Sequence, residues 1–261
     1  MTSTLFQDFN ERSREVSKYF VFLKSLEQGS TQLSMKDFKG NSRIRTVDSE
    51  LLKTLKASGF LLLYNLVEAT MRNAIEAIFD ELRSKEISYD QIRPELKKIV
   101  LKNLKRRSPD KVFSSITLIS LDIITACFDR QDLFSGNIDG KLIRDTANEY
   151  GFSHLTDHIK TGNGTDLITV KTNRNQLAHG FESFAEVGRA KSADQLLVIK
   201  NKVVKYLRQI LQNIEHYISN QAYLESTSAS NSNTLSRYET YSRCDSCNSA
   251  CWIICNCGPR N

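Results

Sequence analysis

Proline and glycine are scarce in this chain. Only three prolines and eleven glycines occur among 261 residues, and a fold of many short strands needs the frequent turns that these residues supply. Cysteine is also scarce, since Cys127 stands alone before residue 244 and the other five cysteines lie between Cys244 and Cys257. These scarcities exclude a disulfide framework through the core and favour a mainly helical fold.

Long apolar runs are missing as well. The opening stretch MTSTLFQDFNERSREVSKYF has acidic residues and no apolar run behind a basic head, so it does not resemble a secretory signal. The most apolar stretch, around residues 60–69, contains Asn65 and Glu68. It is far shorter than the roughly 20 apolar residues that span a bilayer. We therefore expect a soluble, cytoplasmic protein with no membrane partner.

Charge of one sign is only mildly in excess. The formal net charge is +6 and the pI is near 8.9, which permits a polyanion partner but is also common in soluble proteins. Lys98, Lys102 and Lys105 recur at helical spacing, beside Lys97, Arg106 and Arg107. This basic stripe could follow RNA phosphates or could be a solvated helix face.

Apolar residues recur every three or four positions in several segments, as in amphipathic helices. The segment 49–82 is apolar almost all round in its middle, so we expect it to be the central core helix. Ser192 and Gln195 form a capping box at the start of the last long helix. The expected helices cover residues 5–26, 49–82, 89–104, 109–128, 138–150 and 192–218, and a further helix, capped by Thr165 or Asp166, runs through Val170 to His179. Gly29, Gly151 and Gly180 are the expected stops of the helices that they follow.

A change of composition marks the end of the expected domain. Beyond Leu224 the stretch STSASNSNT has too few apolar residues to repay the entropy of ordering. We expect a helical domain at residues 1–224 and, at 225–261, a Ser/Asn-rich linker with a disordered, Cys-rich tail. The tail cysteines suffice for zinc or a cluster, but their spacing fits no standard finger, and an oxidation-prone segment without metal is the alternative.

Polar residues form a stripe on the central helix. Asn65, Glu68 and Arg72 stand at i, i+3 and i+7 and therefore share one face. A carboxylate in such surroundings needs a partner. Glu68 either pairs with Arg72, four positions on, or points to a cation on another helix.

The segment Arg174-Asn175-Gln176-Leu177-Ala178-His179-Gly180 carries the chemistry that we expect. An imidazole with a pKa of about 6.5 can take or give a proton near neutral pH, so His179 is a candidate acid-base residue. Guanidinium matches phosphate oxygens with its fork of donors, so Arg174 is a candidate phosphate ligand. Asn175, four positions before His179, is placed to fix the imidazole ring. A capped, hydrogen-bonded helix end without catalytic function is the alternative.

The spacing of the two candidate groups sets a geometric problem. Residues five apart on an ideal helix point about 140° away from each other. Either the helix loosens at Gly180, or the Arg174 side chain curls round the helix, or two subunits each supply one group to a shared groove. The residue pattern leaves these three solutions open.

The stretch KTNRNQLAHGFESFAEVGR resembles the signature of the HEPN family, in which an Arg and a His are separated by four to six residues. The segments YNLVEATMRNAIEAIFDEL and GNIDGKLIRDTANEYGF and the final helix through Tyr217 resemble the MAE-type subgroup of that family. The resemblance covers most of residues 1–224. It implies a HEPN-like helical bundle that dimerises, with the motifs of two subunits lining one cleft.

The resemblance also implies a function and a set of site residues. Many members are metal-independent ribonucleases of toxin-antitoxin or phage-defence systems, whereas others only bind RNA or a nucleotide. The implied catalytic set is Arg174, His179, Asn175 and Glu68, the last by orienting Arg174, with RNA and a cognate antitoxin protein as partners and with no metal or cofactor. Phe181 stands where members neutralised by nucleotidylation carry Tyr, so that mode of control is not expected.

Overall fold

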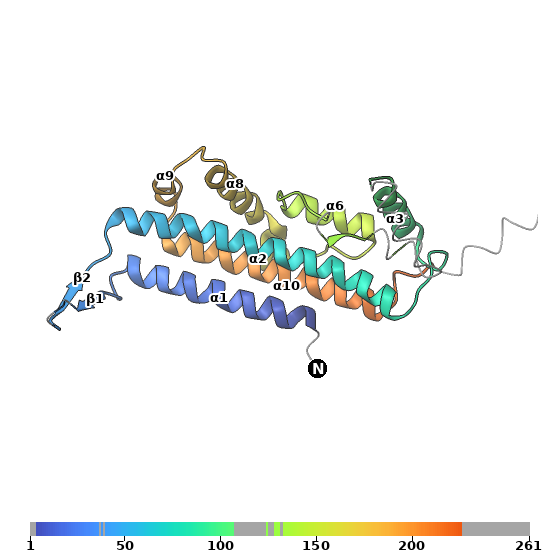
Figure 1. The fold of residues 1–261 in the computed structure, drawn as a ribbon, viewed down its shortest axis with the longest axis horizontal. Coiled ribbons are helices and arrows are strands. Elements are labelled where there is room, and N and C mark those ends of the chain that lie inside the picture. The colour runs from blue at the N-terminus through green and yellow to red at the C-terminus, as the bar shows by residue number, and fades with distance from the viewer. Residues whose placement is uncertain are drawn as a thin grey trace, which may run out of the picture. The chain divides into compact units, whose positions relative to one another are not determined.

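The computed structural model describes residues 4–36, 38, 40–106, 124, 128–130 and 133–225. Three long helices form the main layer: α1 (Thr4–Glu27), α2 (Ser49–Ser84) and α10 (Ala193–Ser219). They lie side by side, and α1 runs in the opposite direction to α2 and α10 (Figure 1). The expected all-α bundle is confirmed.

Shorter helices form a second layer over α2 and α10. Along the upper side of Figure 1 they are α9 (Phe184–Arg189), α8 (Asp166–Ala178), α6 (Gly140–Tyr150) and α3 (Pro94–Arg106). A short helix α7 (His158–Thr161) and a 3-10 turn η2 (Gly162–Gly164) precede α8 and pack on α10. Both α8 and α9 contact α2, so the segment that follows α8 lies near the central helix.

The core is built around α2, as its composition predicts. Val67, Met71, Ile75 and Ile78 of this helix are 0% exposed. Each large apolar side chain that is fully buried contributes about 1.5–3 kcal/mol to folding. They belong to one cluster with side chains of the two neighbouring long helices, among them Phe9, Phe20 and Leu23 of α1 and Val203, Leu207 and Ile210 of α10.

Several helix ends lie where local sequence signals place them. The backbone of Gly29 after α1 and of Gly151 after α6 is left-handed, with φ of 69° and 85°, a conformation that glycine adopts at little cost. The side chain of Ser192 accepts from the N–H of Gln195, and the Gln195 side chain returns the bond. The capping box at the start of α10 is therefore confirmed.

The structure departs from the expected elements at three places. A two-stranded antiparallel hairpin, β1 (Leu33–Lys36) with β2 (Ser42–Arg45), follows α1, and all of its residues are exposed. It has no buried face that alternating apolar residues could have marked. The helix expected from Tyr89 begins only at Pro94, because Ile92 pairs with Leu224 in a β-bridge. A short helix not expected from the sequence, α9, begins with a capping box formed by Ser183 and Glu186.

The helix expected at 109–128 and the tail beyond Glu225 lie outside the described residues, except for Ile124 and Phe128. The described helices belong to one compact unit, residues 1–225. Within the described part of the chain, no helix has the length and apolar character that crossing a membrane requires.

Candidate functional site

The candidate segment ends α8. Gly180 has a φ of 69°, and its N–H donates to the carbonyl of Leu177 at 3.3 Å while the N–H of Phe181 donates to the carbonyl of Gln176 at 2.9 Å. This pair of bonds is a Schellman motif, which satisfies the last carbonyls of a helix. Gly180 therefore ends the helix as predicted, and His179 is its C-cap residue.

The Arg174 guanidinium is fixed against the central helix. Its Cζ lies 4.5 Å from the centroid of the Tyr64 ring, and its Nη1 donates to Asn175 Oδ1 at 2.9 Å and to the carbonyl of Gly136 at 3.3 Å. Tyr64 is only 3% exposed, so the ring that supports the cation is itself held by the core. Among the described residues, the hydrogen bonds of Arg174 use only Nη1, so the donors of Nε and Nη2 are left for other partners.

The loop before α6 holds this arrangement together. In that loop, Asn137 Oδ1 accepts from Asn175 Nδ2 at 2.8 Å, and the N–H of Ile138 donates to the Tyr64 hydroxyl at 3.1 Å. Gly136 of the same loop accepts from Arg174. Residues 136–138 thus join α2 to α8 at the candidate site.

Asp139 anchors the end of that loop. Its side chain caps α6 by accepting from the N–H of Leu142 at 2.9 Å and pairs with Lys171 of α8. Burial raises the pKa of Asp139, but the bonds from Lys171 and Leu142 outweigh it and leave that pKa below the ordinary 3.8. The charged carboxylate therefore stabilises the contact between the loop and α8.

The His179 side chain is exposed at the helix end. Its ring centroid lies 5.7 Å from that of Phe181, and Phe181 is 77% exposed. The expected contact between Asn175 and the imidazole is not among the hydrogen bonds of the described residues, because the Asn175 amide already bonds to Arg174 and Asn137. Asn175 positions Arg174 rather than His179.

Arg174 and His179 are not brought into contact within one chain, as far as the described contacts show. Arg174 lies over Tyr64 toward α2, whereas His179 follows the helix end into solvent. The helix does stop at His179, yet this does not join the two groups.

Glu68 pairs within its own helix. Its carboxylate accepts from Arg72 Nε at 3.1 Å and from Nη2 at 2.8 Å, which is the first of the two interpretations of the polar stripe. Arg72 also donates to the carbonyl of Phe134 at 2.7 Å. Glu68 is therefore linked through Arg72 to the loop beside Arg174. Among the described hydrogen bonds, none joins Glu68 to Arg174 itself.

Tyr64 is the site residue that the sequence did not reveal. Burial raises its pKa, the N–H of Ile138 lowers it, the charge of Glu68 raises it, and the charge of Arg174 lowers it. The ring thus lies within the electrostatic reach of both charged groups. Tyr64 precedes Glu68 by four positions and shares its helix face. This spacing could have pointed to Tyr64, but the residue lies within an apolar run and was therefore assigned to the core.

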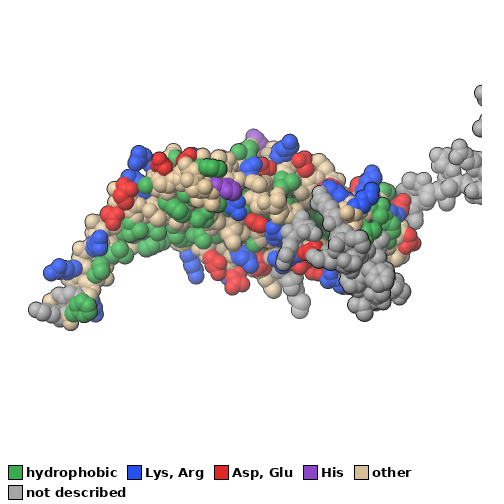
Figure 2. All heavy atoms as spheres, turned by 45° about the horizontal axis from the view of Figure 1, so that its top comes forward, with side chains coloured by type: hydrophobic (Ala, Val, Ile, Leu, Met, Phe, Trp, Pro, Cys, Tyr) green, Lys and Arg blue, Asp and Glu red, His purple; other side chains and the backbone are tan. Residues whose placement is uncertain are grey.

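The other candidate groups from the sequence are the basic stripe and the tail cysteines. Lys102 pairs with Glu149 and Lys97 with Glu225, so part of the basic stripe is neutralised, while Arg107 and the tail cysteines lie outside the described residues. On the face in Figure 2, acidic and basic side chains are interspersed, and histidines lie exposed near hydrophobic side chains. Among the described residues, no group of three or more His, Cys, Asp or Glu side chains could hold a metal ion.

Comparison with known proteins identifies a family. A family model described as MAE_28990-like HEPN matches residues 1–223, which confirms the resemblance drawn from the motif and its flanks. No curated protein and no solved structure matches the chain.

Proposed function

Because the chain belongs to the MAE_28990-like HEPN family, we propose that it is a metal-independent endoribonuclease. The observation that carries this proposal is the state of Arg174: its guanidinium is anchored through Nη1 and the Tyr64 ring, while Nε and Nη2 keep donors for a phosphate. A pre-oriented cation stabilises charge that develops in a transition state without reorganising.

The proposed reaction uses the ribose 2′-OH. His179 accepts the 2′-OH proton as that oxygen attacks the adjacent phosphorus, and the bond from phosphorus to the 5′ oxygen breaks. The departing 5′ oxygen takes up a proton from water and His179 gives its proton back to the solvent, so the products are a 2′,3′-cyclic phosphate and a 5′-OH. Arg174 binds the non-bridging oxygens, and Asn175 keeps Arg174 in place. DNA has no 2′-OH and is not a substrate.

We further propose a homodimer in which Arg174 of one copy faces His179 of the other. The separation of the two groups within one chain supports this, as do the apolar side chains exposed on and beside α8, Ile168 at 55% and Phe181 at 77%. Mixing Arg174→Lys with His179→Ala chains tests it. Random exchange makes half of the dimers mixed, each with one intact composite site, so about a quarter of the wild-type activity returns. Sites built within one chain would recover nothing.

The catalytic proposal is tested with purified variants and RNA in EDTA. Cleavage is expected to disappear in His179→Ala and to fall by about 10²- to 10³-fold in Arg174→Lys, the usual cost of losing one charge-stabilising donor. His216→Ala and Arg83→Lys are matched controls, because His216 bonds to Asn220 at the end of α10 and Arg83 pairs with Asp80 on the surface. RNA binding without any cleavage by the wild type would favour the alternative, a HEPN module that binds RNA or a nucleotide within a larger complex.

Glu68 is proposed as a positioning residue that acts through Arg72. Glu68→Gln removes the charge that holds Arg72 against the Phe134 carbonyl, so we expect a lower kcat with unchanged RNA affinity. Activity equal to that of the wild type would remove Glu68 from the site.

In the cell we propose a toxin or phage-defence effector that a cognate antitoxin protein restrains. Expression is then expected to stop bacterial growth, and the His179→Ala variant to leave growth unaffected. Phe181 supplies no hydroxyl for nucleotidylation, so the proposed restraint acts by protein binding.

A further inference from the structure

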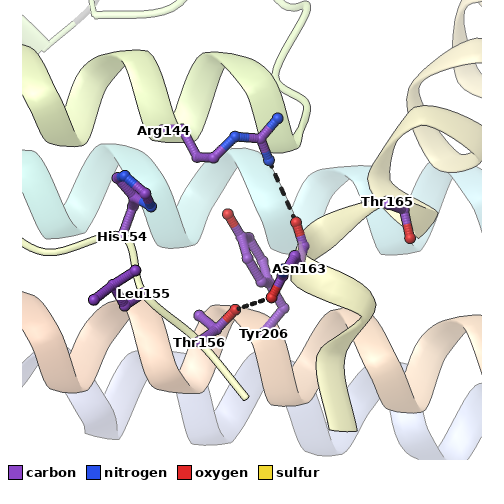
Figure 3. Close-up of a pocket in the computed structure, with 7 residues that line it drawn as sticks. All are labelled: Arg144, His154, Leu155, Thr156, Asn163, Thr165 and Tyr206. Atoms are coloured by element: carbon purple, nitrogen blue, oxygen red, sulfur yellow. Dashed lines mark hydrogen bonds between the residues drawn. The ribbon is translucent and has the colours of Figure 1, made fainter. Parts of the chain in front are cut away.

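A cavity lies at the other end of α8, away from His179. It has a volume of about 370 Å³ and is bounded by α6, by the segment around His154, by η2 and by Tyr206 of α10 (Figure 3). With a rise of 1.5 Å per residue, the 13 residues of α8 separate it by about 20 Å from His179. The cavity therefore does not belong to the Arg174 and His179 segment.

The floor of the cavity contains an unpartnered hydroxyl. Tyr206 is 1% exposed, and its Oη has no hydrogen-bond partner among the described residues. In Figure 3 this hydroxyl rises from the floor toward Arg144. Burial raises the pKa of Tyr206 to about 12, so the group is a protonated donor at neutral pH. Buried hydroxyls are almost always bonded, and this one points to an acceptor supplied by a ligand.

The walls supply positive charge and further donors. Arg144 and His154 line the cavity from two different elements, and Arg144 Nη1 donates to the carbonyl of Asn163 at 3.4 Å. Among the described residues that line the cavity, none is Asp or Glu. Nearby, Asp139 pairs with Lys171, and Asp166, whose Oδ2 has no hydrogen-bond partner among the described residues, lies 3.6 Å from the Lys202 ammonium. The balance of charge facing the cavity is positive.

The cavity is shaped before any ligand arrives. A side chain at Gly164 would place its Cβ 2.8 Å from the Tyr206 ring, so this glycine allows η2 to lie directly on the floor. The Thr156 hydroxyl donates to Asn163 Oδ1 at 3.2 Å, and this bond ties one wall to the other. A pre-organised cavity loses less entropy on binding.

We propose that this cavity binds a phosphomonoester. A planar carboxylate presents two oxygens, whereas a phosphate presents three in a tripod, which matches donors on three separate elements: Arg144 on α6, His154 before α7 and Tyr206 on α10. The guanidinium takes a bidentate pair of phosphate oxygens, and the Tyr206 hydroxyl donates to the third. The volume admits a nucleotide-sized group, so the phosphate can belong to a free nucleoside 5′-monophosphate or to the 5′ end of an RNA strand.

Calorimetric titration of the full chain tests the proposal and separates the two sources. The probes are inorganic phosphate, 5′-AMP, and a 2′-O-methyl oligonucleotide with either a 5′-phosphate or a 5′-OH, which attack by the 2′ oxygen cannot cut. We expect the phosphorylated oligonucleotide to bind at least about tenfold more tightly than its 5′-OH twin. Equal affinity of 5′-AMP and the phosphorylated oligonucleotide identifies a mononucleotide site, and tighter binding of the oligonucleotide identifies an RNA end.

Two variants locate the binding in the cavity. Tyr206→Phe and Arg144→Gln are each expected to raise the Kd of the phosphorylated probe by about tenfold or more, while Tyr19→Phe and Arg83→Gln leave it unchanged. Tyr206→Phe is also expected to unfold at the wild-type temperature, because its hydroxyl has no described partner to lose. Absence of binding by every phosphorylated probe, or an unchanged Kd in both cavity variants, would overturn the proposal. Neither result depends on RNA cleavage.

Discussion

Replacing Tyr64 separates the two contacts that its side chain makes. Tyr64→Phe removes the acceptor of the Ile138 N–H, whose residue is 0% exposed, and a buried donor left without a partner costs about 1–3 kcal/mol. For a domain of this size each kcal/mol lowers Tm by roughly 2–4 °C, so a decrease of about 2–12 °C is expected. The ring under Arg174 is kept, so cleavage by the folded protein stays near the wild-type rate.

Tyr64→Leu removes the ring as well. The cation–π contact at 4.5 Å is worth about 0.5–2 kcal/mol, and its loss lowers the cleavage rate by roughly 2- to 30-fold if Arg174 then leaves its place. Thermal unfolding followed by circular dichroism and single-turnover cleavage of RNA below the unfolding range measure the two effects. Tyr19→Phe is the control for a lost hydroxyl elsewhere. Equal cleavage rates in the Phe and Leu variants would refute the idea that the ring holds Arg174.

Two further predictions concern stability. The pKa of Asp139 is lowered on folding, so its charge contributes stability above about pH 4 and that contribution is lost as the pH falls through the lower folded value. Asp139→Asn keeps a capping side chain, and its deficit in Tm is expected to shrink as the pH falls below about 4; a constant deficit would contradict this. Gly188→Ala places a Cβ 1.9 Å from the Lys53 carbonyl oxygen, so this substitution should lower the free energy of unfolding by about 1–3 kcal/mol or more. The control Gly59→Ala meets only the Phe20 ring at 3.2 Å, and an equal loss of stability in a urea titration would show that α9 can shift freely.

Helix positions could be predicted where the signal is local. The capping box of Ser192, the left-handed glycines Gly29 and Gly151, and the apolar middle of α2 act within a few residues of chain, and each lies where it was expected. The start of α3 could not be placed in this way, because the bridge from Ile92 to Leu224 is a long-range pairing. The hairpin after α1 has no buried face to produce a pattern.

The candidate site shows the same difference between local signals, which could be predicted, and long-range contacts, which could not. Local spacing together with the family resemblance made Arg174, Asn175 and His179 candidates, and spacing gave the pair of Glu68 and Arg72 as one of two alternatives. The support of Arg174 by Tyr64, Gly136 and Asn137 depends on how α2, α8 and the loop before α6 pack together. Side-chain partners of this kind are set by tertiary structure, and periodicity carries no information about them.

The central claim is that Arg174 and His179 cleave RNA through a neighbouring 2′-OH without metal. A DNA oligonucleotide with one ribonucleotide tests it most directly, incubated with the protein in EDTA and analysed by mass spectrometry. The account predicts one cut, on the 3′ side of the ribonucleotide, with a 2′,3′-cyclic phosphate on one product and a 5′-OH on the other, and no cut with His179→Ala. Cleavage at deoxynucleotides, a requirement for divalent metal, or equal cleavage by His179→Ala would contradict it.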